Sequence, residues 1–506
     1  MMFTGAGAGD DVGVVFPRAS DGRRSTLETG RAVFADALRV VSPTAAAAAE
    51  QERDWRRRYI VHARRLTEAA LASASVAQDV AVAGLSSARE RLRFVRDGGE
   101  TSLDAAMAAH RAPFATRSAS GAGSSRPTPL TIPLHGQLLS GDALRRQLDR
   151  WQDEGLFEPS FVAAITRVQA HPEWLDLSDQ RIALLGAHAE MSPLPWLLQW
   201  RATVYAVDLP RSHIWQRMLR LAHEGNGTLM VPCKFEPRPD AATDTLAQQA
   251  GVDLITDAPE IAAWLALAEG PLTVGAYAYL DGAFHVRVSA AMDSIQARLA
   301  ARRRDVKLAM LATPTDACAV PAGALKMAHA RFAGRGLAAK LVYAATAGRA
   351  FARNGEWRTA EPASDEVLGG IVDALVVQQG PNYLLAKRLQ LWRALVARST
   401  GTRVSFRIAP PALTKSVTKN RLIAAVYRSA HRFGAHGFEP ATAAALMAAV
   451  LVHDLRHTHA VANPDVPLDH PLQLMSDAAF HGGLWRMPYS ARSALPVAAV
   501  MGLLRG

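Results

Sequence analysis

Cysteine is nearly absent from this sequence, because Cys233 and Cys318 are the only two among its 506 residues. Two thiols cannot build a disulfide framework or a thiolate metal cage, and a reducing compartment is the simplest interpretation. Long apolar runs are also missing. The best candidate, Ala441–Val452, is shorter than the roughly 18 residues that span a bilayer. With no apolar secretory signal near the N-terminus, the sequence predicts a cytoplasmic protein without a membrane span.

Lysine is scarce too: the chain has seven lysines among 57 basic residues, and a formal net charge of +11. The arginines are spread along the chain, and no long basic block is interleaved with aromatic residues. The nearest approach to one is Arg56–Arg58, flanked by Trp55 and Tyr59, which is typical of a solvated helix face. We therefore predict no nucleic-acid partner. Hydrophobic residues make up 49% of the chain and charged residues 20%, as in a folded protein.

The stretch Arg181–Asp208 has the layout of a nucleotide-binding β-α-β unit. An apolar run, Ile182–Leu185, ends at Gly186, a helical pattern follows, and a second apolar run stops at Asp208. A glycine allows a strand to turn tightly into a helix whose N-terminus faces a phosphate, and an acid at the end of the second strand accepts hydrogen bonds from a ribose. The pattern suits a dinucleotide or S-adenosylmethionine. It also suits a plain buried strand followed by an amphipathic helix.

The rest of the chain divides by composition. We expect a disordered segment at 1–25, a helical region at 26–100, a linker at 101–135, a helical lead-in at 136–175 and a Rossmann-like domain at 176–506 with an insertion at about 316–375. Strand-like and helix-like stretches alternate in the last of these, which predicts a doubly wound, mostly parallel α/β sheet. The predicted strands are Ile182–Leu185, Thr203–Val207, Thr228–Val231, Val252–Ile255, Leu272–Ala276, Val306–Leu311 and Arg403–Ile408.

A second clue to chemistry lies far downstream. Tyr383 and Lys387 are four residues apart in a helical pattern, so both project from one face. An ammonium beside a phenol favours the phenolate, and such a tyrosine can protonate a carbonyl or deprotonate an alcohol. The helix is followed by a strand that ends at Pro410–Pro411, with Thr414 close behind.

Together, these motifs over about Gln180–Glu439 resemble the short-chain dehydrogenase/reductase family. The resemblance implies that Tyr383 is the general acid/base, that Lys387 activates it, and that Thr313 or Thr315 takes the place of the catalytic serine. It also places Asp257 against the adenine ring. The cofactor-binding residues predicted on this basis are Gly186, Ala187, Glu190, Met191, Asp208, Asp257, Pro410 and Thr414.

The expected cofactor is NAD or NADP, and the expected substrate is a small carbonyl or alcohol. The charge of Asp208 favours NAD because it would repel a 2′-phosphate, whereas Arg211 nearby leaves NADP open. Two other hypotheses remain. One is an S-adenosylmethionine-dependent methyltransferase. The other is a non-catalytic scaffold whose N-terminal helices, within Leu27–Val95, bind a partner or a second copy of the chain.

Two further motifs have plainer interpretations. His453 and His457, spaced i, i+4 in HDLRH, resemble a zinc-binding pair, but an aspartate replaces the glutamate of that motif. We predict no metal site and a capped surface helix there. The segment Phe480–Arg486, FHGGLWR, suits either a flexible lid or a turn between packed aromatic residues.

Overall fold

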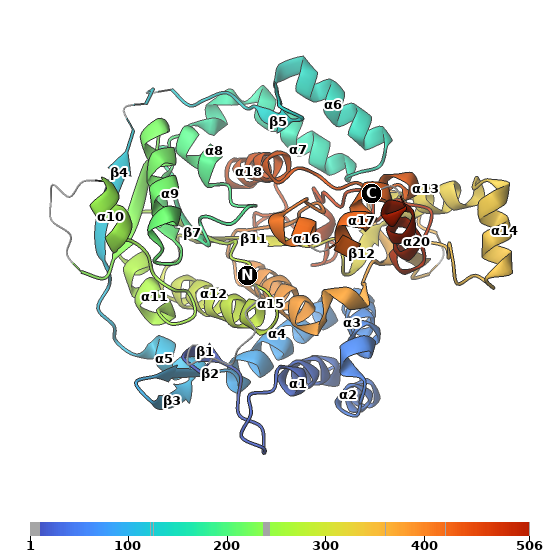
Figure 1. Ribbon diagram of the computed structural model, residues 1–506, viewed down its shortest axis with the longest axis horizontal. Helices are drawn as coiled ribbons and strands as arrows, with labels where there is room; N and C mark the ends of the chain where they lie inside the picture. Colours follow the sequence, from blue (N-terminus) through green and yellow to red (C-terminus); the bar gives the residue numbers. More distant parts are fainter. Residues whose placement is uncertain are drawn as a thin grey trace.

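A seven-stranded sheet forms the centre of the computed structural model (Figure 1), which describes residues 11–121, 123–124, 126–235, 243–359, 361–419 and 421–504. The strand order is β15-β11-β10-β7-β8-β9-β4. All neighbouring pairs are parallel except β4 with β9. The strands are β4 (Ala115–Ser120), β7 (Arg181–Leu185), β8 (Thr203–Val207), β9 (Thr228–Cys233), β10 (Leu272–Ala276), β11 (Val306–Ala312) and β15 (Val404–Ile408). The predicted α/β class with a mostly parallel sheet is confirmed.

Helices cover both faces of this sheet, which explains why its parallel strands are mostly apolar rather than alternating. On β7, Ala183 and Leu185 join one hydrophobic core, and Ile182 and Leu184 join the other. The first core is covered by α11 (Ala258–Ala266), α12 (Ala283–Arg302) and α15 (Pro381–Ser399). The second is covered by α6 (Gly141–Asp153), α7 (Pro159–Ala170), α8 (Leu194–Gln199), α9 (Ser212–Glu224) and α18 (Pro440–Arg456).

The N-terminal region packs on the outer side of α12 and α15 (Figure 1). It contains α1 (Thr26–Arg39), α2 (Pro43–Glu50), α3 (Trp55–Ala72), α4 (Ala74–Arg91) and α5 (Leu103–Ala108), with a small sheet of β1 (Gly13–Val15), β2 (Arg93–Arg96) and β3 (Gly99–Ser102). Gly84 allows α4 to approach α15 closely, since a Cβ there would lie 2.5 Å from the Trp392 ring. These helices therefore share the main core.

The chain between β11 and α15 forms a small unit with its own sheet, of order β12-β14-β13. Its elements are β12 (Ala317–Pro321), α13 (Ala322–Ala333), α14 (Leu337–Ala345), β13 (Glu356–Trp357), β14 (Leu368–Asp373) and η2 (Val377–Gln379). Beside it lie C-terminal elements, which are α16 (Lys415–Lys419), α17 (Arg421–Ser429), η3 (Ala430–Phe433), α19 (Gln473–Ser476) and α20 (Ala491–Leu503). The remaining elements are β5 (Ile132–Leu134), β6 (Gln137–Leu139), η1 (Pro172–Leu175) and α10 (Thr243–Gln249).

The structure differs from several of the predicted segments. Within 1–25, expected to be disordered, Gly13–Val15 form β1, which pairs with β2. The expected linker contributes β4, whose pairing with β9 completes the sheet, and it also contains α5 and β5. The predicted strand Val252–Ile255 is wrong. Gly251 turns the chain with a φ of +106°, and the side chains of Asp253 and Asp257 accept hydrogen bonds from the local amides of Ile255 and Asp253. Those amides are then not available for backbone hydrogen bonds to a neighbouring strand.

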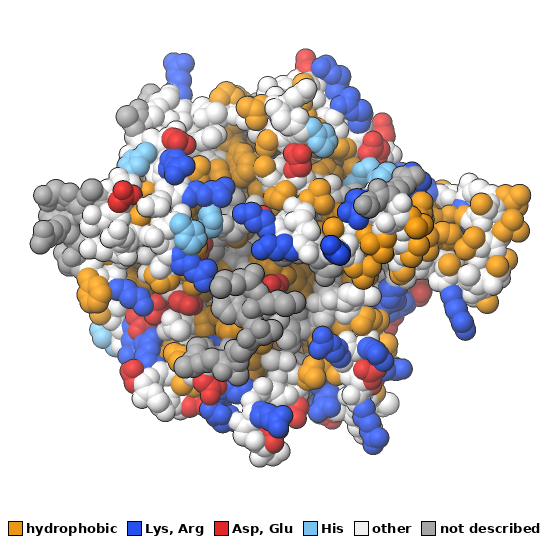
Figure 2. Space-filling view, viewed as in Figure 1, with side chains coloured by type: hydrophobic (Ala, Val, Ile, Leu, Met, Phe, Trp, Pro, Cys, Tyr) orange, Lys and Arg blue, Asp and Glu red, His pale blue; other side chains and the backbone are white. Residues whose placement is uncertain are grey.

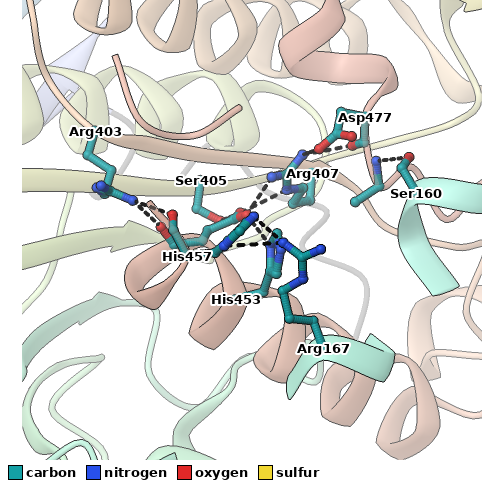
Figure 3. Close-up of polar contacts among 10 residues, drawn as sticks. Ser160, Arg167, Arg403, Ser405, Arg407, His453, His457 and Asp477 are labelled. Atoms are coloured by element: carbon teal, nitrogen blue, oxygen red, sulfur yellow. Dashed lines mark hydrogen bonds and ion pairs between the residues drawn. The ribbon is translucent and has the colours of Figure 1, made fainter. Parts of the chain in front are cut away.

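The interpretation of HDLRH as a surface helix is also wrong, because α18 is buried along most of its length. Figure 3 shows Arg407 of β15 beside Asp477, which follows α19, and Arg407 also binds the buried Asp454 of α18. The Arg407 Nε donates to Asp454 at 2.8 Å, and the Ser405 hydroxyl donates to the same carboxylate at 2.6 Å. Burial by itself would raise the pKa of Asp454, but Arg407 holds it well below its usual range.

The segment Phe480–Arg486 is likewise buried and forms the turn between packed aromatic residues rather than a lid. Phe480 contacts the rings of Phe157, Phe161 and Phe438. His481 and Arg486 both bind the carboxylate of Glu158, at 3.0 and 2.7 Å.

Candidate functional site

The turn after β7 and the acid after β8 meet at the carboxyl edge of the sheet. Gly186 has a φ of +93°, and its amide and that of Ala187 donate to the Val207 carbonyl at 2.9 and 3.1 Å. The His188 amide donates to a carboxylate oxygen of Asp208 at 2.8 Å. Burial raises the pKa of Asp208, and hydrogen bonds from the His188 and Leu209 amides oppose that shift. Asp208 therefore stands where the sequence predicts it, but it binds its own chain.

The turn does not lead directly into a helix as the sequence predicts. The helix α8 begins only at Leu194, after Pro193, and it has six residues. Between Gly186 and Pro193 the amides of Ala189 and Ser192 donate to carbonyls of the same loop. A Cβ on Gly186 would lie 2.4 Å from the Ala278 amide nitrogen, so the close approach of the chain after β10 requires this glycine.

The other predicted cofactor residues lie on loops at this same edge. Glu190 is exposed and accepts the Lys415 amide at 3.0 Å, which joins the β7 loop to the start of α16. Thr414 directly precedes that helix, and Pro410 follows β15 closely. Met191 is a partly buried hydrophobic residue packed against the second core. Asp257 precedes α11 and pairs with Lys234, the residue after β9, at 3.0 Å.

The predicted catalytic side chains converge at the end of β11. The hydroxyls of Thr313 and Thr315 are 2.7 Å apart, and the Gln379 amide donates to Thr315 at 2.9 Å. Burial raises the pKa of Tyr383, and hydrogen bonding with Thr313 and Gln379 opposes that rise. These residues come from the turn after β11, from η2 and from the first turn of α15. Only the folded insertion brings η2 and α15 back to β11.

Lys387 lies one turn after Tyr383, with its Nζ 6.0 Å from the centroid of the tyrosine ring. The ammonium donates to the Leu311 carbonyl at 2.9 Å and to the Gln390 side chain at 3.3 Å. Burial lowers the pKa of Lys387 to about 8. A cation near a phenol favours loss of the phenolic proton, and here the two groups lie near each other without direct contact.

His285 is a functional candidate that the sequence does not indicate. It is 1% exposed and lies against Tyr383, with ring centroids 5.4 Å apart. Its Nδ1 accepts the Leu280 amide at 3.4 Å, whereas Nε2 has no hydrogen-bond partner. Burial, with a smaller effect from Lys387, lowers the pKa of His285 to about 3. The imidazole is therefore neutral, and its Nε2 is free to bind a ligand.

Two other features support a binding site here. The Oε1 of Gln379 is buried and unpartnered, so two orphaned polar atoms flank Tyr383. Buried polar groups without partners carry a free-energy cost and are common where a ligand or water completes the site. The rings of Tyr279 and Tyr383 pack with their centroids 6.1 Å apart. Tyr279 comes directly after Tyr277 and Ala278, whose backbone amides donate to the Leu185 carbonyl. This segment links the Gly186 turn to the Tyr383 cluster.

The sequence matches no family model and no curated protein. The resemblance to short-chain dehydrogenases therefore stays a prediction. Across the part of the chain that the structure describes, no three His, Cys, Asp or Glu side chains are arranged to hold a metal ion. Within the same residues, no helix has both the length and the apolar character needed to cross a bilayer.

Proposed function

We propose that this protein is a divergent NAD(P)-dependent oxidoreductase of the cytoplasm that acts on a carbonyl or alcohol. The observation that carries the proposal is the cluster of Tyr383, Thr313 and Lys387 at the carboxyl end of β11. The orphaned Nε2 of His285 beside this cluster adds a donor that a substrate can satisfy. Proton transfer to a carbonyl needs such a group within direct reach of the reacting oxygen.

The sheet topology supports a dinucleotide. Numbering the six parallel strands along the chain, the order across the sheet is 3-2-1-4-5-6 from β9 to β15. This is the order of Rossmann-like doubly wound folds, in which ligands bind at the switch point between the first and fourth strands. Here those strands are β7 and β10. The loops that follow them carry Gly186 and Tyr279.

The chemistry expected of the protein side chains follows from their states. A nicotinamide would supply the hydride for the carbonyl carbon. Tyr383 would donate its proton to the carbonyl oxygen, and the Thr313 hydroxyl would polarise the same oxygen. With a pKa of about 8, Lys387 is mostly charged at neutral pH and stabilises the phenolate that remains. In the oxidative direction Tyr383 accepts the proton of the alcohol.

The loops at the carboxyl edge of the sheet offer groups for the ribose of the cofactor but fewer for its pyrophosphate. Each Asp208 oxygen accepts one backbone amide and keeps lone pairs for a ribose hydroxyl. Arg211 lies near enough to lower the pKa of Asp208 and could meet a 2′-phosphate. The amides of Gly186 and Ala187, by contrast, are engaged with Val207. A pyrophosphate would therefore have to bind other groups of the loop that follows β7.

The direct test compares NADH, NADPH and S-adenosylmethionine in thermal-shift and titration experiments. A ligand at about 100 times its Kd stabilises the native state by about 2.7 kcal/mol, which raises the melting temperature measurably. We expect a shift with NADH or NADPH and none with S-adenosylmethionine. The Tyr383→Phe variant should keep that shift but lose turnover of a panel of ketones and secondary alcohols. A variant that turns over at the wild-type rate would remove Tyr383 from the mechanism.

The occupied amides of the Gly186 turn favour one other candidate, a non-catalytic nucleotide-fold protein. In that case none of the three ligands changes the melting temperature. A shift with S-adenosylmethionine alone would instead indicate a methyltransferase, in which Tyr383 has no role.

A further inference from the structure

Three segments of this chain contain no acidic residue: 326–355, 410–438 and 478–504. They hold 13 of the 57 Lys and Arg residues and none of the 46 Asp and Glu residues, which leaves 44 basic against 46 acidic residues elsewhere. The net positive charge of the protein is therefore concentrated in these segments. An arginine-rich composition alone would spread the charge evenly.

The fold brings the three segments together into one end of the molecule, which we call the basic end. The helices α17 and α20 pack closely, since a Cβ on Gly502 would lie 1.9 Å from the Ala425 carbonyl oxygen. Phe351 contacts Tyr489 and Phe433, with ring centroids 4.8 and 5.8 Å apart, so aromatic residues from all three segments form one contact.

The basic end also exposes apolar side chains. Leu337 and Leu341 of α14 are 72% and 61% exposed, and no residue of that helix is buried. Other exposed hydrophobic residues there are Val342, Leu413, Leu422, Val500, Leu503 and Leu504. Figure 2 shows hydrophobic side chains gathered over α14, α17 and α20, at the right of the view. Exposed apolar side chains gathered at one end of a molecule mark an interaction surface.

The three segments also carry exposed cations, which include Lys340, Arg349, Lys415, Lys419, Arg421 and Arg432. Acids of other segments pair with some cations of the three segments: Asp365 with Lys326, Asp373 with Arg492, and Glu158 with the buried Arg486. We propose that the basic end docks on an anionic lipid surface, with α14, α17 and α20 lying in the interface. Cations around exposed leucines match anionic headgroups above an acyl layer.

The same features disfavour other occupants. A second copy would place two strongly positive faces against each other, and like charges across an interface oppose association. A nucleic acid would match the cations but would leave the leucines exposed, because phosphate contacts need no apolar surface.

The test uses the full-length protein in sedimentation with vesicles of phosphatidylcholine, alone or with about 30% phosphatidylserine. We expect the protein to pellet with the anionic vesicles, at least about tenfold more tightly than with neutral ones, and to be released by salt. This binding requires no nicotinamide, so its outcome is independent of the proposed oxidoreductase activity.

Two variants divide the interaction into its parts. Lys340→Glu/Arg349→Glu/Arg432→Glu should lower the affinity by about a hundredfold, at about fivefold for each cation lost. Leu337→Ser/Leu341→Ser should lower it about tenfold, with folding intact because neither side chain is buried. The matched controls, Arg53→Glu/Arg56→Glu/Arg57→Glu and Leu138→Ser/Leu267→Ser, change exposed residues outside the basic end and should bind as the wild type does.

Four results would overturn the proposal. The first is no binding to anionic vesicles. The second is equal loss of binding in the control variants. The third is a concentration-dependent dimer that Leu337→Ser/Leu341→Ser abolishes in the absence of any vesicle binding, which would assign the surface to a second copy. Binding to a DNA duplex with higher affinity than to anionic vesicles would also contradict it.

Discussion

Replacing Lys387 by methionine should make the protein more stable at neutral pH, although it removes a proposed functional group. Burial lowers the pKa of this lysine from 10.5 to about 8. The unfolded chain then binds the proton more tightly than the folded one. A difference of about 2.5 pKa units corresponds to about 3 kcal/mol at a pH below both values. At pH 7 the charged lysine therefore opposes folding by about this amount.

The substitution also has a cost. Methionine cannot donate to the Leu311 carbonyl, which Lys387 reaches at 2.9 Å, and a buried carbonyl without its donor costs about 1 kcal/mol or more. The net gain expected at pH 7 is about 1–2 kcal/mol. As the pH rises from 8 to 10.5, Lys387 loses its proton, and its charge no longer opposes folding of the wild type. The gain should then disappear, and the variant should become less stable than the wild type by about 1 kcal/mol.

Urea-induced unfolding followed by tryptophan fluorescence, at pH 7 and at pH 10, measures both free energies of unfolding. Subtracting one free energy of unfolding from the other removes the effect of the ionisable groups that both proteins share. Lys340→Met is the control, because Lys340 lies exposed on α14 and the same substitution there should have a small effect that does not change with pH. A Lys387→Met protein whose stability difference is independent of pH would show that the lysine is not desolvated, and the reasoning would fail.

Two other substitutions test the packing that positions the site. Asp454→Asn removes the buried carboxylate that binds Arg407 and leaves only the half-buried Asp477 beside it, and we expect a loss of about 3–5 kcal/mol in the free energy of unfolding at pH 7. Because the Asp454 pKa is lowered in the folded state, this contribution is present above its unfolded value and declines as pH falls below about 4, so the two proteins should converge in acid. The double variant Arg407→Met/Asp454→Leu should recover most of the loss, and failure to recover it would argue against an isolated charge effect. Gly84→Ala places a methyl group against Trp392 and should cost about 1–3 kcal/mol in the same urea assay. An unchanged midpoint would mean that α4 is not part of the main core.

Local patterns were sufficient for the elements that carry the proposed chemistry. The apolar runs before Gly186 and Asp208 are strands, and Tyr383 and Lys387 lie on one helix. Apolar runs that end at a glycine or an acid depend only on neighbours in the chain, so sequence reasoning reached them. The same reasoning failed at Val252–Ile255, where aspartate side chains bind the amides that a strand would need.

Local sequence patterns did not predict the contacts between distant segments of the chain. Asp454 can be buried within α18 because it pairs with a residue 47 positions away, and HDLRH alone resembles a surface helix. His285 carries no local signal, because its neutrality and its unpartnered Nε2 result from the packing of α12 against α15. The helix predicted to begin at the Gly186 turn starts later, since Pro193 and Pro195 suit a first helical turn better than the residues before them.

By itself, the sequence determined the α/β class, the positions of most strands, the spacing of Tyr383 and Lys387 and the excess of basic residues. Each of these depends on hydrophobic periodicity, on covalent spacing or on composition. The tertiary structure decided which strands are neighbours, which helices are buried, how Thr313, Gln379 and His285 surround Tyr383, and that three segments without acids form one surface. Those outcomes depend on long-range packing and desolvation, which act only when distant parts of the chain exclude water from one another.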